Sequence, residues 1–445
     1  MRPSRRSAGY AVRRSAGPQY GRRTPPRQYP TTTRRAPALF IGCLLLILII
    51  LCCSGSLRSC RRWMDARREA SQTAATEPES VAPEPVPEPA TVYGTAEQFA
   101  RAPLMNSVRV VIEDRHTGEP ARGRGVETRA DPGATLHVLL QCRRGGEGGN
   151  IYYSGAPSAV WGETVIPDGM LLPWPEAEFG PLNIRWFKIE PTKTALSNRS
   201  GGSFFMATIE YEETPINEWA NQWSVPADVT PAIHEPSLPG YGTMRYKVSV
   251  SLADPEGTIS KSLESVGMEQ MMVGGIAPEV PRLSLRRDDS FLGWLFAWGN
   301  VPYVFASASD RGDRNTSRHQ TELFQGVDGA DLIYGALRKV GYDVTYSTTH
   351  GLAEVATTLY RDLDPTGPQV YEANGQALTW SEEGIRAGDI ILWGDHAAVL
   401  LRDGPGRAEG VLDIDDFVIH TRDGPPAEAT LGSAWDTRRI TILRP

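Results

Sequence analysis

A run of 22 uncharged residues, from Ala36 to Leu57, constrains this chain more than any other feature of its sequence. Its centre, from Leu39 to Leu51, is almost entirely aliphatic. At about 1.5 Å per residue, a helix of this length covers roughly 33 Å, enough for a bilayer core of ~30 Å. The run therefore predicts one transmembrane helix over residues 36–57. We expect it to remain as a signal anchor, because no Ala-x-Ala cleavage site follows it.

The segments on either side of this helix indicate its orientation. Residues 1–35 contain ten arginines and no acidic residue, a composition that predicts a disordered basic tail. Five arginines lie close to each end of the apolar run, so only the full tail favours a cytoplasmic N-terminus. Residues 58–90 form a linker rich in proline and glutamate, which is expected to be extended. The protein is thus predicted to be single-pass in the cell membrane, with most of the chain extracytoplasmic.

Charge and cysteine usage exclude several classes of function. The formal net charge is −7 although the tail contributes ten positive charges, so the remainder is strongly acidic and nucleic acid is not an expected partner. Four of the five cysteines lie in or beside the apolar run, which leaves Cys142 alone in the folded part. Neither a disulfide framework nor a zinc site can be built from one cysteine, and no metal or other cofactor is expected.

Residues 91–287 alternate between apolar and polar side chains in short runs that are separated by glycine and proline. This pattern is typical of antiparallel strands and predicts an all-β, sandwich-like domain. The predicted strands are 107–112, 135–140, 183–189, 204–211 and 244–252.

Residues 288–445 show a different pattern, with helices first and strands after them. Apolar residues spaced three and four apart from Leu332 to Val340 predict a helix that begins near Asp328 and ends at Gly341. A second helix is expected over His350–Leu363. Two strands then surround a turn within 388–401, and a third covers 417–421. On pattern alone this last domain is α+β.

Four segments of this last domain resemble the NlpC/P60 group of papain-like cysteine peptidases, many of which cut peptide cross-bridges of bacterial cell wall. Three of them match in order and spacing, and the fourth lacks a key residue. Val301–Phe305 resembles the family's Pro-Tyr-x-Trp-Gly segment, Gly388–Leu401 its Gly-Asp strand followed by a histidine, and Ile419-His420 its Ile-His-Ala ending. Asp328–Leu332 resembles the nucleophile motif Asp-Cys-Ala/Ser-Asp/Gly-Leu, but Gly329 stands where the cysteine would be. The resemblance implies a papain-like α+β fold for residues 288–445.

The resemblance also implies roles for individual residues. In such enzymes a thiol at a helix N-terminus is ionised by the helix and a nearby imidazole, and the thiolate attacks the amide. His396 corresponds to the base and His420 to the residue that orients it, whereas Gly329 has no side chain to act as nucleophile. Tyr303, Asp328 and Asp331 are the candidate binding residues, although helix capping and dipole complementarity also explain both aspartates.

The leading hypothesis is a membrane-anchored envelope protein whose NlpC/P60-like domain is a pseudoenzyme. Its expected partner is cell-wall peptide or another envelope protein, bound without hydrolysis. One alternative is an active wall peptidase that uses another nucleophile, although Cys142 belongs to a strand-like run of the other domain. A second alternative is an envelope scaffold that acts through its β-rich domain.

Overall fold

The computed structural model describes residues 88–445 except 144–148, 201–202, 257–258, 309–318, 365–369, 371, 373, 406–408 and 435–438. Residues Val86–Pro445 form one compact unit. The predicted tail, the predicted transmembrane helix and nearly all of the predicted linker lie outside the described residues. Within the described part of the chain, no helix has the length and apolar character needed to cross a membrane.

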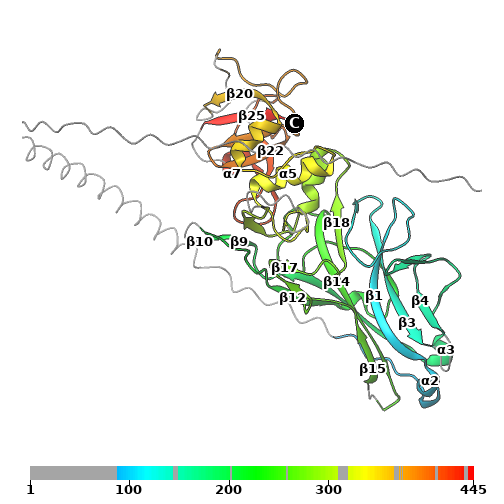
Figure 1. Ribbon diagram of the computed structural model, residues 1–445. Helices are drawn as coiled ribbons and strands as arrows, with labels where there is room; N and C mark the ends of the chain where they lie inside the picture. Colours follow the sequence, from blue (N-terminus) through cyan, green and yellow to red (C-terminus); the bar gives the residue numbers. More distant parts are fainter. Residues whose placement is uncertain are drawn as a thin grey trace, which may run out of the picture. The chain divides into compact units, whose positions relative to one another are not determined.

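Two sheets form the first half of this unit (Figure 1). In one sheet the strand order is β1-β3-β4-β7, and β13 also pairs with β3. Strands β4 and β7 are parallel, and all other neighbouring strands of this sheet are antiparallel. The strands are β1 (Leu104–Asp114), β3 (Ala134–Arg143), β4 (Asn150–Ser154), β7 (Leu171–Leu172) and β13 (Ser224–Pro226). In the other sheet the order is β12-β8-β14-β18-β2, and β15 pairs with β14. These strands are β2 (Val126–Arg129), β8 (Asn183–Pro191), β12 (Tyr211–Ile216), β14 (Gly242–Ala253), β15 (Ile259–Glu264) and β18 (Arg282–Arg286).

One large hydrophobic core draws on both of these sheets. It combines alternate residues of β1 and β3, such as Val110 and Leu140, with Trp186 of β8 and Tyr246 and Val248 of β14. Because successive side chains of a strand point to opposite faces, the alternating sequence pattern places one apolar set in this core.

Short elements connect the strands of this half. They are the helices α2 (Ala96–Arg101), α3 (Glu176–Phe179) and η1 (Asn217–Trp219), and the paired strands β5 (Ala159–Trp161) with β6 (Thr164–Ile166), β10 (Arg199–Ser200) with β11 (Ser203–Phe204), and β16 (Met271–Met272) with β17 (Gly275–Ile276). A capping box formed by Thr95 and Gln98 starts α2.

The second half of the unit is built around an antiparallel sheet of order β20-β25-β21-β22-β23-β24. Its strands are β20 (Thr357–Leu363), β21 (Ile390–Trp393), β22 (His396–Arg402), β23 (Phe417–His420), β24 (Ala427–Thr430) and β25 (Ile440–Arg444). The helices are α4 (Phe291–Leu295), η2 (Phe296–Trp298), α5 (Gly329–Lys339), η4 (Thr349–Gly351), α6 (Leu352–Val355) and α7 (Leu431–Ala434).

Both faces of this sheet are buried, each by different neighbours. Ile390, Leu392 and Val399 share a core with α4 and α5. Their immediate neighbours Ile391 and Leu400 face a second core, which includes Leu431 of α7. Both faces of the sheet are therefore apolar, which explains why the sequences of these strands are continuous apolar runs.

Several contacts join the two halves. Strand β19 (Tyr303–Phe305) pairs in parallel with β9 (Ala195–Ser197). Glu127 of β2, which is already paired with Arg282 of the same sheet, also forms an ion pair with Lys339 of α5 at 2.6 Å. The predicted domain boundary at residue 287 remains a prediction.

The fold class expected from the sequence is wrong. Of the described residues, 41% are in strands and 13% in helices. The strands form several sheets, so this part of the chain is mostly β and no α+β papain-like arrangement is evident in it. The predicted helix over His350–Leu363 contributes to this difference, because α6 ends at Val355 and β20 begins at Thr357. The apolar residues of this segment have helical spacing, but the segment pairs with β25, and this tertiary pairing decides its conformation.

Candidate functional site

The N-terminus of α5 is held by the side chain of Asp328, as the sequence predicts. One carboxylate oxygen of Asp328 accepts the N–H of Asp331 at 2.8 Å, and the other accepts the N–H of Ala306 at 2.9 Å. The helix ends at Lys339 with Val340 as its C-cap, and Gly341 follows with φ +97°, a left-handed conformation that glycine adopts without steric cost. Asp328 thus fixes both the start of α5 and the chain that follows β19.

Two histidines from neighbouring strands face each other beside this helix. His396 is the first residue of β22 and His420 is the last residue of β23. Nε2 of His396 and Nδ1 of His420 are 3.1 Å apart and share a hydrogen bond. The ring of Trp393 packs edge-on against His396, with ring centroids 4.9 Å apart. These contacts give the His396 ring a defined orientation.

Gly329 lies directly against His396. A Cβ atom at this glycine would be 3.2 Å from both Nδ1 and Cε1 of His396, and 3.3 Å from the carbonyl oxygen of Thr421. Gly329 is buried, whereas His396 and His420 are partly exposed. The structure therefore brings together the first residue of α5 and both histidines, three residues that are far apart in the sequence.

The two aspartates of the helix start make a buried pair. Asp331 is 4% exposed, and one of its oxygens accepts hydrogen bonds from the Ser307 hydroxyl at 2.7 Å and the Ala308 N–H at 2.8 Å. Burial, followed by the nearby charge of Asp328, raises the pKa of Asp331 well above its ordinary value. Both carboxylates are engaged in holding residues 306–308 against α5, and their predicted role in binding remains a prediction.

Tyr303 lies on β19, which leads into the segment bound by Asp328. Its backbone forms a β-bridge with Val327, next to Asp328. Burial, and then the negative charge of Asp328, raises the pKa of the Tyr303 hydroxyl, so the phenol stays neutral. Its side chain is partly exposed.

Cys142 is remote from this group in the fold. It is buried in β3, in the core shared by the first two sheets, and burial raises its pKa to about 12. A thiol with such a pKa is almost entirely protonated at neutral pH and is a poor nucleophile.

Comparisons with protein-family models, curated proteins and solved structures found no match for this chain. The relationship to NlpC/P60 peptidases therefore remains a prediction based on the residues themselves. Sequence reasoning missed the part played by Ser307 and Thr421, because neither belongs to a motif and both contribute through hydrogen bonds or backbone atoms.

Acidification is expected to destabilise the protein through His420. Burial, and then the positive charge of Arg422, lowers the pKa of His420, while Asp423 raises it by less. The unfolded chain therefore takes up a proton near the ordinary pKa of about 6.5 before the folded protein does. The free energy of unfolding should fall as the pH drops below this value, by no more than about 1.4 kcal/mol per pH unit for one proton.

Urea unfolding of the native protein and of His420→Gln at pH 7, 6 and 5 measures this effect. The variant should lose less stability on acidification, while other histidines such as His137, whose pKa is also lowered by burial, affect both proteins equally. Identical pH dependence of the two proteins would show that His420 does not protonate more readily on unfolding.

Proposed function

We propose that this chain is a membrane-anchored protein of the bacterial envelope that binds cell-wall peptide without hydrolysing it, through a degenerate NlpC/P60-like site. The observation that carries the proposal is the position of Gly329. It lies at the N-terminus of α5 with its Cβ direction aimed at Nδ1 of His396, whose other ring nitrogen meets His420. A cysteine here would complete a nucleophile, base and orienting residue.

Glycine at position 329 provides no nucleophile to break an amide bond, but the residues around this position remain. The contacts that hold a substrate do not depend on the thiol, whereas attack on an amide does. The hydroxyls of Ser307 and Thr321 are no substitute, because both residues are buried and the two hydroxyls are hydrogen-bonded to each other at 2.8 Å. The aspartate carboxylates are poor nucleophiles toward an unactivated amide. Binding without cleavage is the function that this arrangement supports best.

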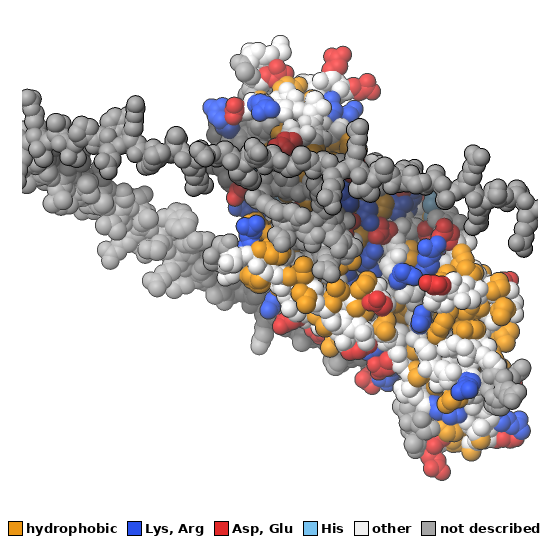
Figure 2. Space-filling view, in the orientation of Figure 1, with side chains coloured by type: hydrophobic (Ala, Val, Ile, Leu, Met, Phe, Trp, Pro, Cys, Tyr) orange, Lys and Arg blue, Asp and Glu red, His pale blue; other side chains and the backbone are white. Residues whose placement is uncertain are grey.

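An exposed apolar surface continues from the site. Phe305 is 45% exposed and directly precedes Ala306, whose N–H is bound by Asp328. Figure 2 shows apolar side chains on the face where Figure 1 places β9, β10 and β17. Exposed large apolar residues here belong to the hairpins β10–β11 and β16–β17, to the residue that follows β11, and to β19. They are Phe204, Phe205, Met271, Met272, Val273 and Phe305. A surface of this kind favours a binding role.

A combined binding and digestion assay tests the proposal. The full chain in detergent micelles is titrated into fluorescently labelled cell-wall peptides, and the same mixtures are analysed by mass spectrometry. We expect saturable binding with no cleavage above the protein-free blank. Phe305→Ser should weaken binding about tenfold, equivalent to about 1.4 kcal/mol. Tyr342→Ser, at a residue that is 44% exposed, is the matched control and should bind normally.

Each alternative predicts a different result in this assay. Cleavage by the native chain would mean that it is a peptidase with another nucleophile. Absence of binding would favour the scaffold hypothesis. In that case deletion of residues 91–287, with the last part intact, should abolish assembly of the chain with its envelope partners.

A further inference from the structure

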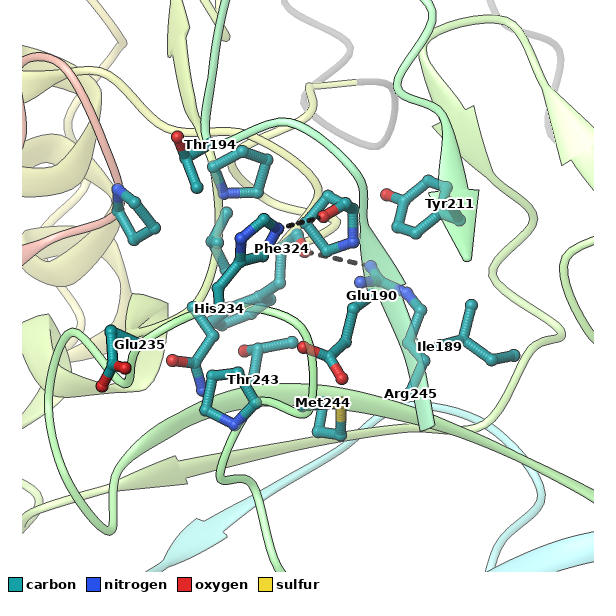
Figure 3. Close-up of a pocket in the computed structure, with 16 residues that line it drawn as sticks. Ile189, Glu190, Thr194, Tyr211, His234, Glu235, Thr243, Met244, Arg245 and Phe324 are labelled. Atoms are coloured by element: carbon teal, nitrogen blue, oxygen red, sulfur yellow. Dashed lines mark hydrogen bonds between the residues drawn. The ribbon is translucent and has the colours of Figure 1, made fainter. Parts of the chain in front are cut away.

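A cavity of about 210 Å³ lies where strands β8 and β14 meet the segments around Val301 and Phe324 (Figure 3). Its volume is about seven times the ~30 Å³ that one water molecule occupies in the liquid. Gly329, His396 and His420 are not among its lining residues. The cavity is therefore separate from the site proposed above.

Arg245 of β14 brings an uncompensated positive charge to this cavity. The residue is 6% exposed, and Nη2 donates to the carbonyl oxygens of Leu323 and Phe324, both at 3.0 Å. Among the described residues, its Nε and Nη1 have no hydrogen-bond acceptor, and no carboxylate oxygen lies within 4.0 Å of its nitrogens. Its guanidinium carbon lies over the ring of Tyr211, 5.7 Å from the ring centroid.

A second buried arginine in the same sheet shows the usual arrangement. Arg282 of β18 is paired with Glu127 at 2.9 Å. Burial lowers the pKa of both arginines, but in Arg282 the charge of Glu127 opposes this effect, whereas in Arg245 only Tyr211 does. A buried charge without a partner is costly, so the cavity beside Arg245 favours an anion.

Two further polar atoms in the cavity wall lack hydrogen-bond partners. These are the hydroxyl oxygen of Tyr211, a residue that is 8% exposed, and Oδ1 of Asn300. Figure 3 shows the Tyr211 hydroxyl turned toward the interior of the group of lining side chains. A buried hydroxyl without a hydrogen-bond partner normally lowers the stability of the folded protein, and a ligand oxygen would accept a hydrogen bond from it.

Two acidic residues, Glu190 and Glu235, also line the cavity, and neither forms an ion pair with Arg245. Glu190 is 2% exposed, and its carboxylate oxygens accept the N–H groups of Ala232 at 2.8 Å and Ile233 at 3.5 Å. His234 is bound to the carbonyl oxygen of Pro191 at 2.8 Å. The remaining wall is largely apolar, with Ile189, Met244, Val301, Pro302 and Phe324 among its members.

We propose that this cavity binds a carboxylate group on a small aliphatic body. The carboxylate would accept hydrogen bonds from the remaining N–H groups of Arg245 and from the hydroxyl of Tyr211, and the aliphatic body would lie against Ile189, Met244 and Val301. Charge-assisted hydrogen bonds of this kind are stronger than neutral ones, and they are stronger still where water is excluded. This carboxylate belongs either to a free short-chain acid or to the carboxyl terminus of a peptide.

Calorimetric titration of the full chain in detergent micelles tests this proposal with three probes. Isobutyrate represents the free acid, N-acetyl-alanyl-alanine represents a peptide terminus, and isobutyramide is the neutral isostere of the first. We expect at least one carboxylate to bind, and the amide to bind at least tenfold more weakly than isobutyrate if isobutyrate binds. Whichever carboxylate binds more tightly identifies the source. Binding of isobutyramide as tight as that of isobutyrate, or no binding by either carboxylate, would overturn the proposal.

Substitutions connect any binding to this cavity. Tyr211→Phe removes a hydroxyl that has no partner, so it should fold normally and bind the carboxylate about fivefold to tenfold more weakly. Tyr342→Phe, an exposed tyrosine outside the cavity, is the matched control. Arg245→Gln should abolish binding. This substitution also removes the hydrogen bonds to the carbonyl oxygens of Leu323 and Phe324, so the variant can fail to fold. In that case Tyr211→Phe decides the outcome. Unchanged affinity in Tyr211→Phe would place the binding elsewhere.

Discussion

Replacing Gly329 by cysteine is expected to create a thiol that ionises well below the ordinary cysteine pKa of about 8.5. The new Cβ would lie 3.2 Å from Nδ1 of His396, at the N-terminus of α5. An imidazole and a helix N-terminus both stabilise the thiolate, and together they commonly lower the pKa by one or more units. Alkylation by iodoacetamide at pH 7 should then be about tenfold faster than for the same thiol in a variant that also carries His396→Ala.

Peptide-level mass spectrometry measures this alkylation across a range of pH and separates residue 329 from the five natural cysteines. Cys142 provides an internal contrast, because its pKa is raised to about 12. Gly329→Ala carries the same Cβ contact and reports any loss of stability. In the cysteine variant, a further His396→Ala substitution should raise the thiol pKa again. A thiol pKa at or above 8.5 with His396 present would mean that the helix and the imidazole do not act on this position.

The same variant tests how much of a hydrolytic site survives. Cleavage of cell-wall peptide by Gly329→Cys, together with an inert native chain, would show that only the nucleophile is missing. A reactive thiol without cleavage would show that further parts of a catalytic site are lost, which is compatible with binding alone.

Replacing Gly242 by alanine is expected to cost about 4 kcal/mol or more of the free energy of unfolding. Gly242 begins β14 with φ +116°, a conformation that side-chain-bearing residues rarely adopt. An added Cβ would lie 2.4 Å from the carbonyl oxygen of Gly299 and 2.6 Å from its carbon. These are backbone atoms, held close because the N–H of Thr243 donates to the same oxygen at 2.8 Å. Strain and backbone displacement therefore add together.

Thermal and urea unfolding of Gly242→Ala measure this cost, which corresponds to a decrease in Tm of roughly 5 °C for a folded unit of this size. Gly240 is the matched control, because it also has a positive φ of +80° but no atom within 4 Å of its Cβ position. Gly240→Ala should lose only about 1 kcal/mol from backbone strain. Equal losses in the two variants would show that the contact with Gly299 does not limit stability.

Much of the β structure could be predicted from residue patterns, because alternation of apolar and polar residues is a local signal. The runs 107–112, 135–140, 183–189 and 244–252 lie within β1, β3, β8 and β14. The run 204–211 is mostly not strand, since β11 ends at Phe204 and β12 begins at Tyr211. The segment from His350 to Leu363 misled the helix prediction, because helical spacing there coincides with residues that pair with β25.

The candidate site could be predicted in part. The capping role of Asp328 follows from its place before an apolar helical stripe, and the structure confirms it. The proximity of Gly329, His396 and His420 was implied only by a family resemblance, because no local pattern connects residues that are so far apart. The cavity beside Arg245 was not anticipated at all. An arginine in an alternating strand looks like a solvent-facing residue until the packing of the segment around Phe324 is known.

The position of β25 has a consequence for synthesis of the chain. This strand, Ile440–Arg444, lies between β20 and β21 and hydrogen-bonds to both. While the ribosome is still adding these residues, β20 and β21 cannot be joined, and each presents an unpaired strand edge to other molecules. The first two sheets need nothing beyond Arg286 and can form earlier, since nascent chains fold from the N-terminal side. A premature stop codon shortly before Ile440 would therefore leave an aggregation-prone sheet on an otherwise folded protein.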